Sequence, residues 1–293
     1  FIVRQNNRLF GFHSPSSYDV LLCGNDKFKY KSGFEDLIEI LLDDESSIES
    51  KTDCLINLNN NIQLSPKPFK FYLDLNFINS IFSLASVQPY ICCLVYKFFY
   101  NLMKNFSRDL YSVFANLDIY KNTISNISPS LDHFAYHHIL LFICETIQQV
   151  PESIQFLVEC GLLDQLSNMD ENENIDQVLF IYSNVLILNE ENDYSSIANI
   201  FNYLSKSKIT TIGNALYYIH KCLQKQDSDY VWKYAIFDER LSFLLETFNA
   251  HIVSNVIYCY TLICNFGEEP ISMLIDEKNI LKKILHFIFD TIE

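Results

Sequence analysis

The chain of 293 residues has a formal net charge of −15 and a pI near 4.8, and only six of its residues are glycine. The acidic balance argues against nucleic-acid binding, because phosphates need clustered Lys and Arg side chains. The scarcity of glycine disfavours nucleotide-binding and hydrolase folds, and no apolar run approaches the roughly 20 residues that span a bilayer.

Residues 1–68 are predicted to be an irregular segment or a degenerate capping repeat. Residues 1–32 alternate aromatic with small and polar side chains and show no sustained period. One helix is expected near residues 34–42, and residues 43–53 are predicted to be a solvated loop. The asparagine-rich stretch 55–64 is ambiguous between helix and loop, and Pro66 and Pro68 end it.

From residue 69 onward, short amphipathic segments recur at spacings of about 38 to 43 residues. These segments are centred near Phe77, Ile119, Leu162, Ile200, Leu241 and Ile280. Longer and more apolar helices are predicted after them, over residues 89–103, 131–148, 176–188, 212–224 and 252–266. A fixed period favours stacked repeats over a compact helical bundle, the alternative, because each unit buries its apolar face against its neighbours.

Residues 151–188 show the repeat most clearly. A short helix follows Pro151, Gly161 breaks the chain, and a second short helix precedes an acidic loop and the longer helix 176–188. This arrangement distantly resembles one repeat of the armadillo family. The resemblance implies an all-α fold, a right-handed α-solenoid of armadillo/HEAT-like repeats, with about five to six units over residues 69–293.

In armadillo proteins the third helices line a concave groove that receives an extended peptide or a partner helix. In the importin-alpha branch, Trp and Asn project from these helices at i and i+4, and the Asn amides bind the ligand backbone. Only Phe180 and Asn184 keep both members of such a pair here, and Lys97 and Thr261 stand at two of the Trp positions. The binding residues that the resemblance implies are Asn101, Phe142, Thr146, Phe180, Asn184, Tyr217, Lys221 and Asn265, and we expect the five at the Asn position to form one exposed ladder. The alternative is that the aromatic residues are core.

The middle of the chain is acidic. No Lys or Arg occurs between Lys121 and Lys206. Two acidic groups flank the helix 176–188 and are expected to place negative charge on both rims of a groove: Asp170, Glu171, Glu173 and Asp176, then Glu190, Glu191 and Asp193. A basic partner would suit these rims, and an ordinary solvated surface is the other interpretation.

Candidate chemistry is sparse. His133 and His137 lie at i and i+4 next to His138, a spacing that can chelate a metal, but an assured third and fourth ligand is lacking, so no metal or other cofactor is predicted. The nine cysteines are scattered and form no CxxC pair, which indicates small buried hydrophobes in a reducing compartment. No catalytic motif is present.

The sequence therefore predicts a non-enzymatic scaffold or adaptor that binds a basic peptide or protein segment. It would work in the cytoplasm, with the nucleus as the alternative compartment. Two other functions stay open: a structural subunit of a larger assembly, and a carrier resembling nuclear-import adaptors. A regulatory or metal-binding enzyme subunit is a more distant third.

Overall fold

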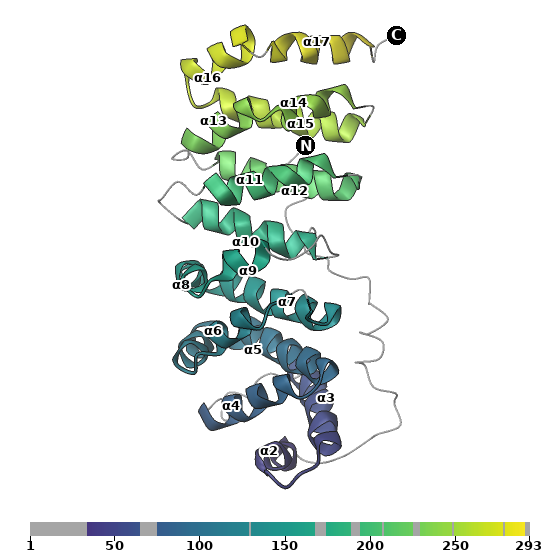
Figure 1. Cartoon of the computed structure of the whole chain (residues 1–293), viewed down its shortest axis with the longest axis vertical. Helices are drawn as coiled ribbons and strands as arrows, with labels where there is room; N and C mark the ends of the chain where they lie inside the picture. The colour runs from purple at the N-terminus through teal and green to yellow at the C-terminus, as the bar shows by residue number, and fades with distance from the viewer. Residues whose placement is uncertain are drawn as a thin grey trace. The chain divides into compact units, whose positions relative to one another are not determined.

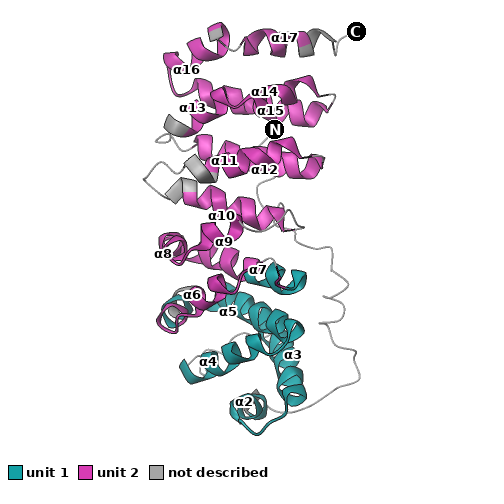
Figure 2. Cartoon of the chain, viewed as in Figure 1, with its two compact units in different colours: residues 1–113, 132–139 teal, residues 114–131, 140–293 magenta. Residues whose placement is uncertain are grey.

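The computed structural model describes residues 34–64, 75–128, 130–167, 174–188, 194–206, 208–224, 229–247, 249–277 and 279–290. These residues form helices joined by short turns and contain no strand, which confirms the predicted all-α class (Figure 1). The chain divides into two compact units (Figure 2). Unit 1 comprises residues 1–113 and 132–139, and unit 2 comprises residues 114–131 and 140–293. The predicted domain boundary at residue 68 lies outside the described residues.

Unit 1 is built around the first part of a long helix, α5 (Pro89–Asn116). Helix α2 (Phe34–Leu42) has the predicted bounds and packs against both α3 (Ile48–Leu64) and α4 (Leu75–Ser83). The short 3-10 turn η2 (Leu84–Ser86) joins α4 to α5. The core side chains include Leu37, Leu55, Phe77, Phe98 and Phe99.

Two sequence predictions in unit 1 are wrong. Residues 48–53 are not a loop, because the backbone N–H of Ser50 donates to the Ser47 hydroxyl and starts α3 there. The helix predicted to end near residue 103 continues to Asn116, because Leu110 and Phe114 extend its buried side. The predicted end was set where the continuous apolar run stops, but the helical spacing of apolar residues continues beyond it.

Asn59 shows how the ambiguous asparagine-rich stretch becomes helical. Its side chain is buried, and its amide nitrogen donates to the backbone carbonyls of Leu55 and Leu94, at 3.0 Å each. Leu94 belongs to α5, so this polar side chain ties α3 to α5. A buried amide is tolerated when its hydrogen bonds are made.

The first part of unit 2 contains an aromatic cluster. Helix α6 (Ile119–Ser125) follows the end of α5, and α7 (His133–Gln149) places Phe142 against both. The Phe142 ring stacks on Tyr120 at 5.4 Å between centroids and meets Phe114 edge-on at 5.4 Å. The repeat at residues 151–188 then forms α8 (Ser153–Glu159), α9 (Leu162–Ser167) and α10 (Ile175–Leu188), and Gly161 turns between α8 and α9 with a positive φ of 89°.

The rest of unit 2 repeats one arrangement. The long helices α10, α12 (Ile209–Gln224) and α15 (Ala250–Cys264) pack in that order, α12 against α10 and α15 against α12. Shorter helices precede each of the later two. These are α11 (Tyr194–Asn202) with η3 (Tyr203–Ser205), then α13 (Asp229–Phe237), α14 (Glu239–Phe243) and η4 (Leu244–Glu246). The last elements are α16 (Glu268–Ser272), the π-helical turn η5 (Met273–Glu277) and α17 (Ile280–Asp290).

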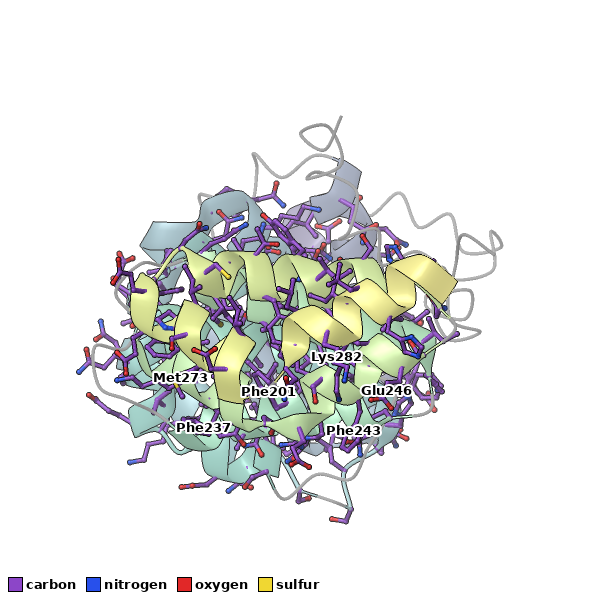
Figure 3. The ribbon with its side chains drawn as sticks, turned by 90° about the horizontal axis from the view of Figure 1, so that it is seen from above. Phe201, Phe237, Phe243, Glu246, Met273 and Lys282 are labelled. Atoms are coloured by element: carbon purple, nitrogen blue, oxygen red, sulfur yellow. The ribbon has the colours of Figure 1, made fainter. Side chains whose placement is uncertain are left out.

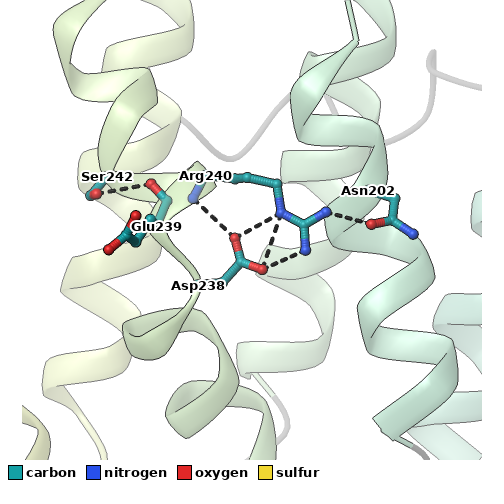
Figure 4. Close-up of polar contacts among 5 residues, drawn as sticks. All are labelled: Asn202, Asp238, Glu239, Arg240 and Ser242. Carbon is teal, nitrogen blue, oxygen red and sulfur yellow. Dashed lines mark hydrogen bonds and ion pairs between the residues drawn. The ribbon is translucent and has the colours of Figure 1, made fainter.

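A group of side-chain hydrogen bonds links the start of α14 to α11. Asp238 caps α14 by accepting from the Arg240 backbone N–H at 3.0 Å, and its carboxylate also accepts from the Arg240 guanidinium at 2.5–3.1 Å (Figure 4). The same guanidinium donates to the Asn202 side-chain oxygen at 2.5 Å. Asn202 is the last residue of α11, so Arg240 connects the start of α14 to the end of α11.

None of the helices in the described ranges is both long enough and apolar enough to cross a membrane.

Candidate binding surface

One side of α12 carries partly exposed polar side chains at helical spacing. Asn214, Tyr217 and Lys221 are partly exposed and Gln224 is exposed, whereas Leu216, Ile219 and Leu223 on the other sides are buried. We call the four residues Asn214, Tyr217, Lys221 and Gln224 the polar stripe of α12.

Helix α15 matches this stripe at three of the four positions, and the fourth, the counterpart of Lys221, is the buried Leu262. The two helices begin 41 residues apart, at Ile209 and Ala250, and the counterparts of Asn214, Tyr217 and Gln224 at that spacing are Asn255, Tyr258 and Asn265. Hydrogen bonds join the two helices: Gln224 Nε2 donates to the Tyr258 hydroxyl at 3.2 Å, and His220 Nε2 lies 2.8 Å from the Asn255 carbonyl oxygen. The stripes are therefore neighbours on one surface.

Helix α10 joins the same surface through Asp176, which is hydrogen-bonded to the amide nitrogen of Asn214 on α12. Burial raises the pKa of Asp176, and the hydrogen bond from Asn214 opposes that shift. One turn before the end of α10, Asn184 is partly exposed and its amide nitrogen donates to the Phe180 carbonyl at 2.8 Å. Side-chain hydrogen bonds thus connect α10 to the polar stripe of α12 through Asp176, and that stripe to α15 through Tyr258.

Comparison with known proteins yields little beyond the fold. No family model and no curated protein matches this chain. Among solved structures, the chain is similar to the crystal structure of an engineered protein, with a TM-score of 0.62 and 11% sequence identity over 80% of this chain and 99% of the other. At that identity the likeness concerns the fold alone.

The predicted ladder is wrong at several positions. Asn101 is 6% exposed and Thr146 is fully buried, and each makes hydrogen bonds inside its own unit, to Asn59 and Tyr120 respectively. Phe142 and Phe180 are buried as well, so they are core residues and cannot stack on a ligand. Asn184, Tyr217 and Lys221 are partly exposed, as a ladder requires, and Asn265 is exposed.

The errors arise because the predicted ends of the helices differ from the observed ones. Asn101 lies in the middle of α5, since that helix continues to Asn116, and Asn265 lies one residue beyond the end of α15. In α15 the position that matches Tyr217 is Tyr258, not Thr261, a difference of nearly one turn. Tyr258 and Asn255 were not predicted, because the helix starts expected from the sequence, residues 212 and 252, are 40 residues apart, whereas the observed starts are 41 residues apart.

Lys221 is the cationic member of the polar stripe. Its ammonium nitrogen lies 4.9 Å from the centroid of the Tyr217 ring and 5.7 Å from that of Tyr218. Burial raises the pKa of the Tyr218 phenol, so at neutral pH it is a neutral ring and not a counter-ion. The stripe therefore offers one fixed cation held over aromatic faces.

The predicted acidic rims fall mostly outside the described residues. This applies to Asp170, Glu171, Glu173, Glu190, Glu191 and Asp193. Only Asp176 is described, and its bond to Asn214 holds it between α10 and α12. Asp176 is therefore not a rim residue, and the prediction for that side chain is wrong.

The histidine group makes local contacts. His138 is buried with its Nδ1 2.9 Å from the Phe134 carbonyl oxygen, and its ring meets that of His137 edge-on at 5.4 Å. Asp132 accepts from the backbone N–H groups of Phe134 and Ala135 and so caps α7. Within the described part of the chain, no three His, Cys, Asp or Glu side chains are grouped so that they could hold a metal ion.

Several thiols are held in the neutral form. Burial raises the pKa of Cys92 to about 11 and that of Cys93 to about 12, and it raises the pKa values of Cys144 and Cys259 as well. A thiol is a poor nucleophile compared with its thiolate. These cysteines therefore act as small apolar side chains in the packing of their helices.

His220 gives the structure a dependence on pH that can be measured. Burial lowers its pKa, and the hydrogen bond to the Asn255 carbonyl opposes that shift. The unfolded chain takes up a proton near pH 6.5 that the folded chain resists. Stability should therefore fall as the pH drops below about 6.5, by at most about 1.4 kcal/mol per pH unit from this group.

We expect His220→Gln to reduce that fall in urea denaturation between pH 7 and pH 5. His251→Gln, a change at an exposed histidine of α15, is the matched control. Equal slopes in all three proteins would show that His220 is not held neutral by its surroundings.

Proposed function

We propose that this chain is a non-enzymatic protein-interaction scaffold, built as a right-handed armadillo-like α-solenoid of about five to six repeats. The observation that carries the proposal is the polar stripe of α12, which side-chain hydrogen bonds connect to α10 and α15, on helices whose other sides are packed. Such a surface suits recognition of an extended peptide or protein segment. We propose the cytoplasm or nucleus as its compartment.

The amides beside the stripe suit a partner that presents an extended peptide backbone. The amide nitrogens of Asn184 and Asn255 both donate to the backbone carbonyl one turn earlier, at 2.8 and 2.9 Å. Each amide nitrogen has a second N–H, and each amide oxygen accepts, so these side chains can bind both the C=O and the N–H groups of a peptide backbone.

The charge of the chain favours a basic partner over an acidic one. The sequence between Asn122 and Ser205 contains acidic residues but no Lys or Arg. Each exposed ion pair contributes only about 0.2–1 kcal/mol, so several must act together. Their attraction is screened beyond about 8 Å at physiological salt, which makes association sensitive to ionic strength.

We expect a partner captured from cell extract and then purified to bind at least about ten-fold more weakly when Asp170, Glu171, Glu190 and Glu191 are changed to Lys, since several pairs are lost together. The same change of charge at Asp44, Glu45, Glu49 and Asp53, all exposed in unit 1, is the matched control. Titration at low and high salt completes the test. An acidic partner, or affinity that neither salt nor the reversal alters, contradicts the proposal of a basic partner.

A structural subunit of a larger assembly is the second candidate. It is favoured by apolar side chains on the last helix, where Leu281 and Leu285 are 49% and 44% exposed. A subunit of this kind would bind through that end and not through the polar stripe.

A further inference from the structure

The long helices of the candidate binding surface carry very few charges. Helices α10, α12 and α15 contain one acidic residue, Asp176, and one basic residue, Lys221, and no other Asp, Glu, Lys or Arg. Both side chains are partly exposed. Two opposite charges on otherwise neutral helices form a fixed pattern that a bound partner has to match.

The two charges lie along the same side of α12. Asp176 comes from α10, but its carboxylate accepts a hydrogen bond from Asn214 Nδ2 and is held beside that residue of α12. Lys221 follows Asn214 by seven residues. Seven residues are close to two full helical turns and advance about 10 Å along the axis. Tyr217 lies between the two positions on the same side of the helix.

Neither charge is neutralised within the described part of the chain. Asp176 is bonded to Asn214, which is a neutral side chain. The Lys221 ammonium lies 4.9 and 5.7 Å from the ring centroids of Tyr217 and Tyr218, and such rings attract a cation but leave its charge in place. The ion pairs among the described residues involve neither side chain. Each can therefore pair with an opposite charge on a ligand.

Asp176 gains more from such a pair than a fully exposed carboxylate does. Burial raises the pKa of Asp176, because the charged form is incompletely hydrated, and the hydrogen bond from Asn214 offsets only part of that shift. A cation that a ligand places beside the carboxylate stabilises its charged form.

The separation of the charges sets the size and the conformation of the ligand. A free amino acid carries its ammonium and carboxylate groups on a single carbon atom, so it cannot reach both ends of a gap of about 10 Å. A segment in the polyproline II conformation advances about 3.1 Å per residue and places every third side chain on the same side, about 9 Å apart. Its backbone groups are unpaired and open to amide side chains. A helical ligand needs a spacing of seven residues, and its backbone groups are already paired.

We propose that the polar stripe of α12 selects an extended segment with one basic and one acidic side chain three residues apart. The basic side chain meets Asp176, the acidic one meets Lys221, and the segment crosses Tyr217 between them. This inference rests on the proposed function, because it names the class of peptide that the scaffold binds. A single acidic residue within an otherwise basic partner satisfies it.

Selection of binders from a library of random peptides displayed on phage, with the full chain immobilised, tests the spacing. We expect the selected peptides to share a basic and an acidic residue at i and i+3. Replacing that acidic residue by its amide should weaken binding at least about three-fold in fluorescence anisotropy, and the loss should vanish in the Lys221→Gln protein. Asp176→Asn can keep the hydrogen bond to Asn214 and should remove the preference for the basic residue.

Reversal of one charge makes the test specific. Selection on Lys221→Glu should replace the acidic residue of the peptides by a basic one. Lys233→Glu and Lys282→Glu are the controls and should leave the selected pattern unchanged. Lys233 also lies over an aromatic ring, 5.3 Å from the centroid of Trp232, and Lys282 is exposed on α17, in the layer nearest the viewer in Figure 3. Circular dichroism checks that each variant is folded.

The outcomes separate this inference from the proposed function. Selected peptides that lack the charge spacing, or a pattern that Lys221→Glu does not alter, overturn the inference and leave the scaffold function standing. A spacing of seven residues indicates a helical ligand and overturns it as well. If no peptide is enriched above an empty support, both the inference and the proposed peptide binding are wrong.

Discussion

Phe142→Ala should destabilise the chain by about 3–5 kcal/mol, because a buried phenylalanine reduced to alanine leaves a cavity that its neighbours cannot fill. Phe142 is fully buried, stacked on Tyr120 and edge-on to Phe114. Urea denaturation monitored by circular dichroism measures the change. Since the armadillo resemblance implied that this residue binds a ligand, the variant also checks its assignment to the core.

Tyr217→Ala is the control for that experiment. Tyr217 stands at the equivalent place in the family resemblance but is partly exposed, so its loss should change stability by less than about 1 kcal/mol. If Phe142→Ala were as stable as Tyr217→Ala, the aromatic cluster of α5, α6 and α7 would not be part of the core.

Tyr258→Ala should weaken partner binding by about 2 kcal/mol, roughly thirty-fold, with little loss of stability. Tyr258 is 43% exposed in the stripe, its hydroxyl accepts from Gln224, and its ring meets His220 edge-on at 4.8 Å. Because these contacts hold the ring in place, little conformational entropy is lost when a partner packs against it. Titration calorimetry with the captured partner measures the effect.

Two further variants serve as controls for Tyr258→Ala. Tyr258→Phe keeps the ring and should retain most of the affinity if stacking dominates. Phe237→Ala removes an aromatic side chain of α13 that is 57% exposed and is not part of the stripe, and it should leave binding unchanged. Equal losses for Tyr258→Ala and Phe237→Ala would mean that exposed aromatics contribute to binding without regard to position.

The sequence predicted the helical class and several helices well. The predicted bounds of α2 agree with the structure, and α7, α10, α12 and α15 lie within three residues of their predicted ranges at each end. Apolar periodicity suffices there because each helix buries one broad side. The period near 40 residues is also visible in unit 2, in the spacing of α12 and α15.

The candidate binding surface was harder to predict, because it depends on which turn of each helix faces outward. An error of nearly one turn exchanged Tyr258 for Thr261, and the long extension of α5 left Asn101 in the middle of a buried helix. Asp176 was predicted to lie on a rim because it belongs to the acidic group 170–176, and the sequence does not reveal its hydrogen bond to Asn214, 38 positions away. Such contacts belong to packing between repeats, which periodicity within one helix does not encode.

Site-specific photo-crosslinking tests the central claim, that a partner binds on the polar stripe, most directly. A photoreactive phenylalanine analogue would replace Tyr217, Tyr258 or, as the control, Phe237 in the full chain, and each variant would be irradiated with the captured partner. Since the analogue reacts only with what it touches, we expect crosslinks from positions 217 and 258 and none from position 237. Crosslinks from position 237 alone would place the partner elsewhere and contradict the account.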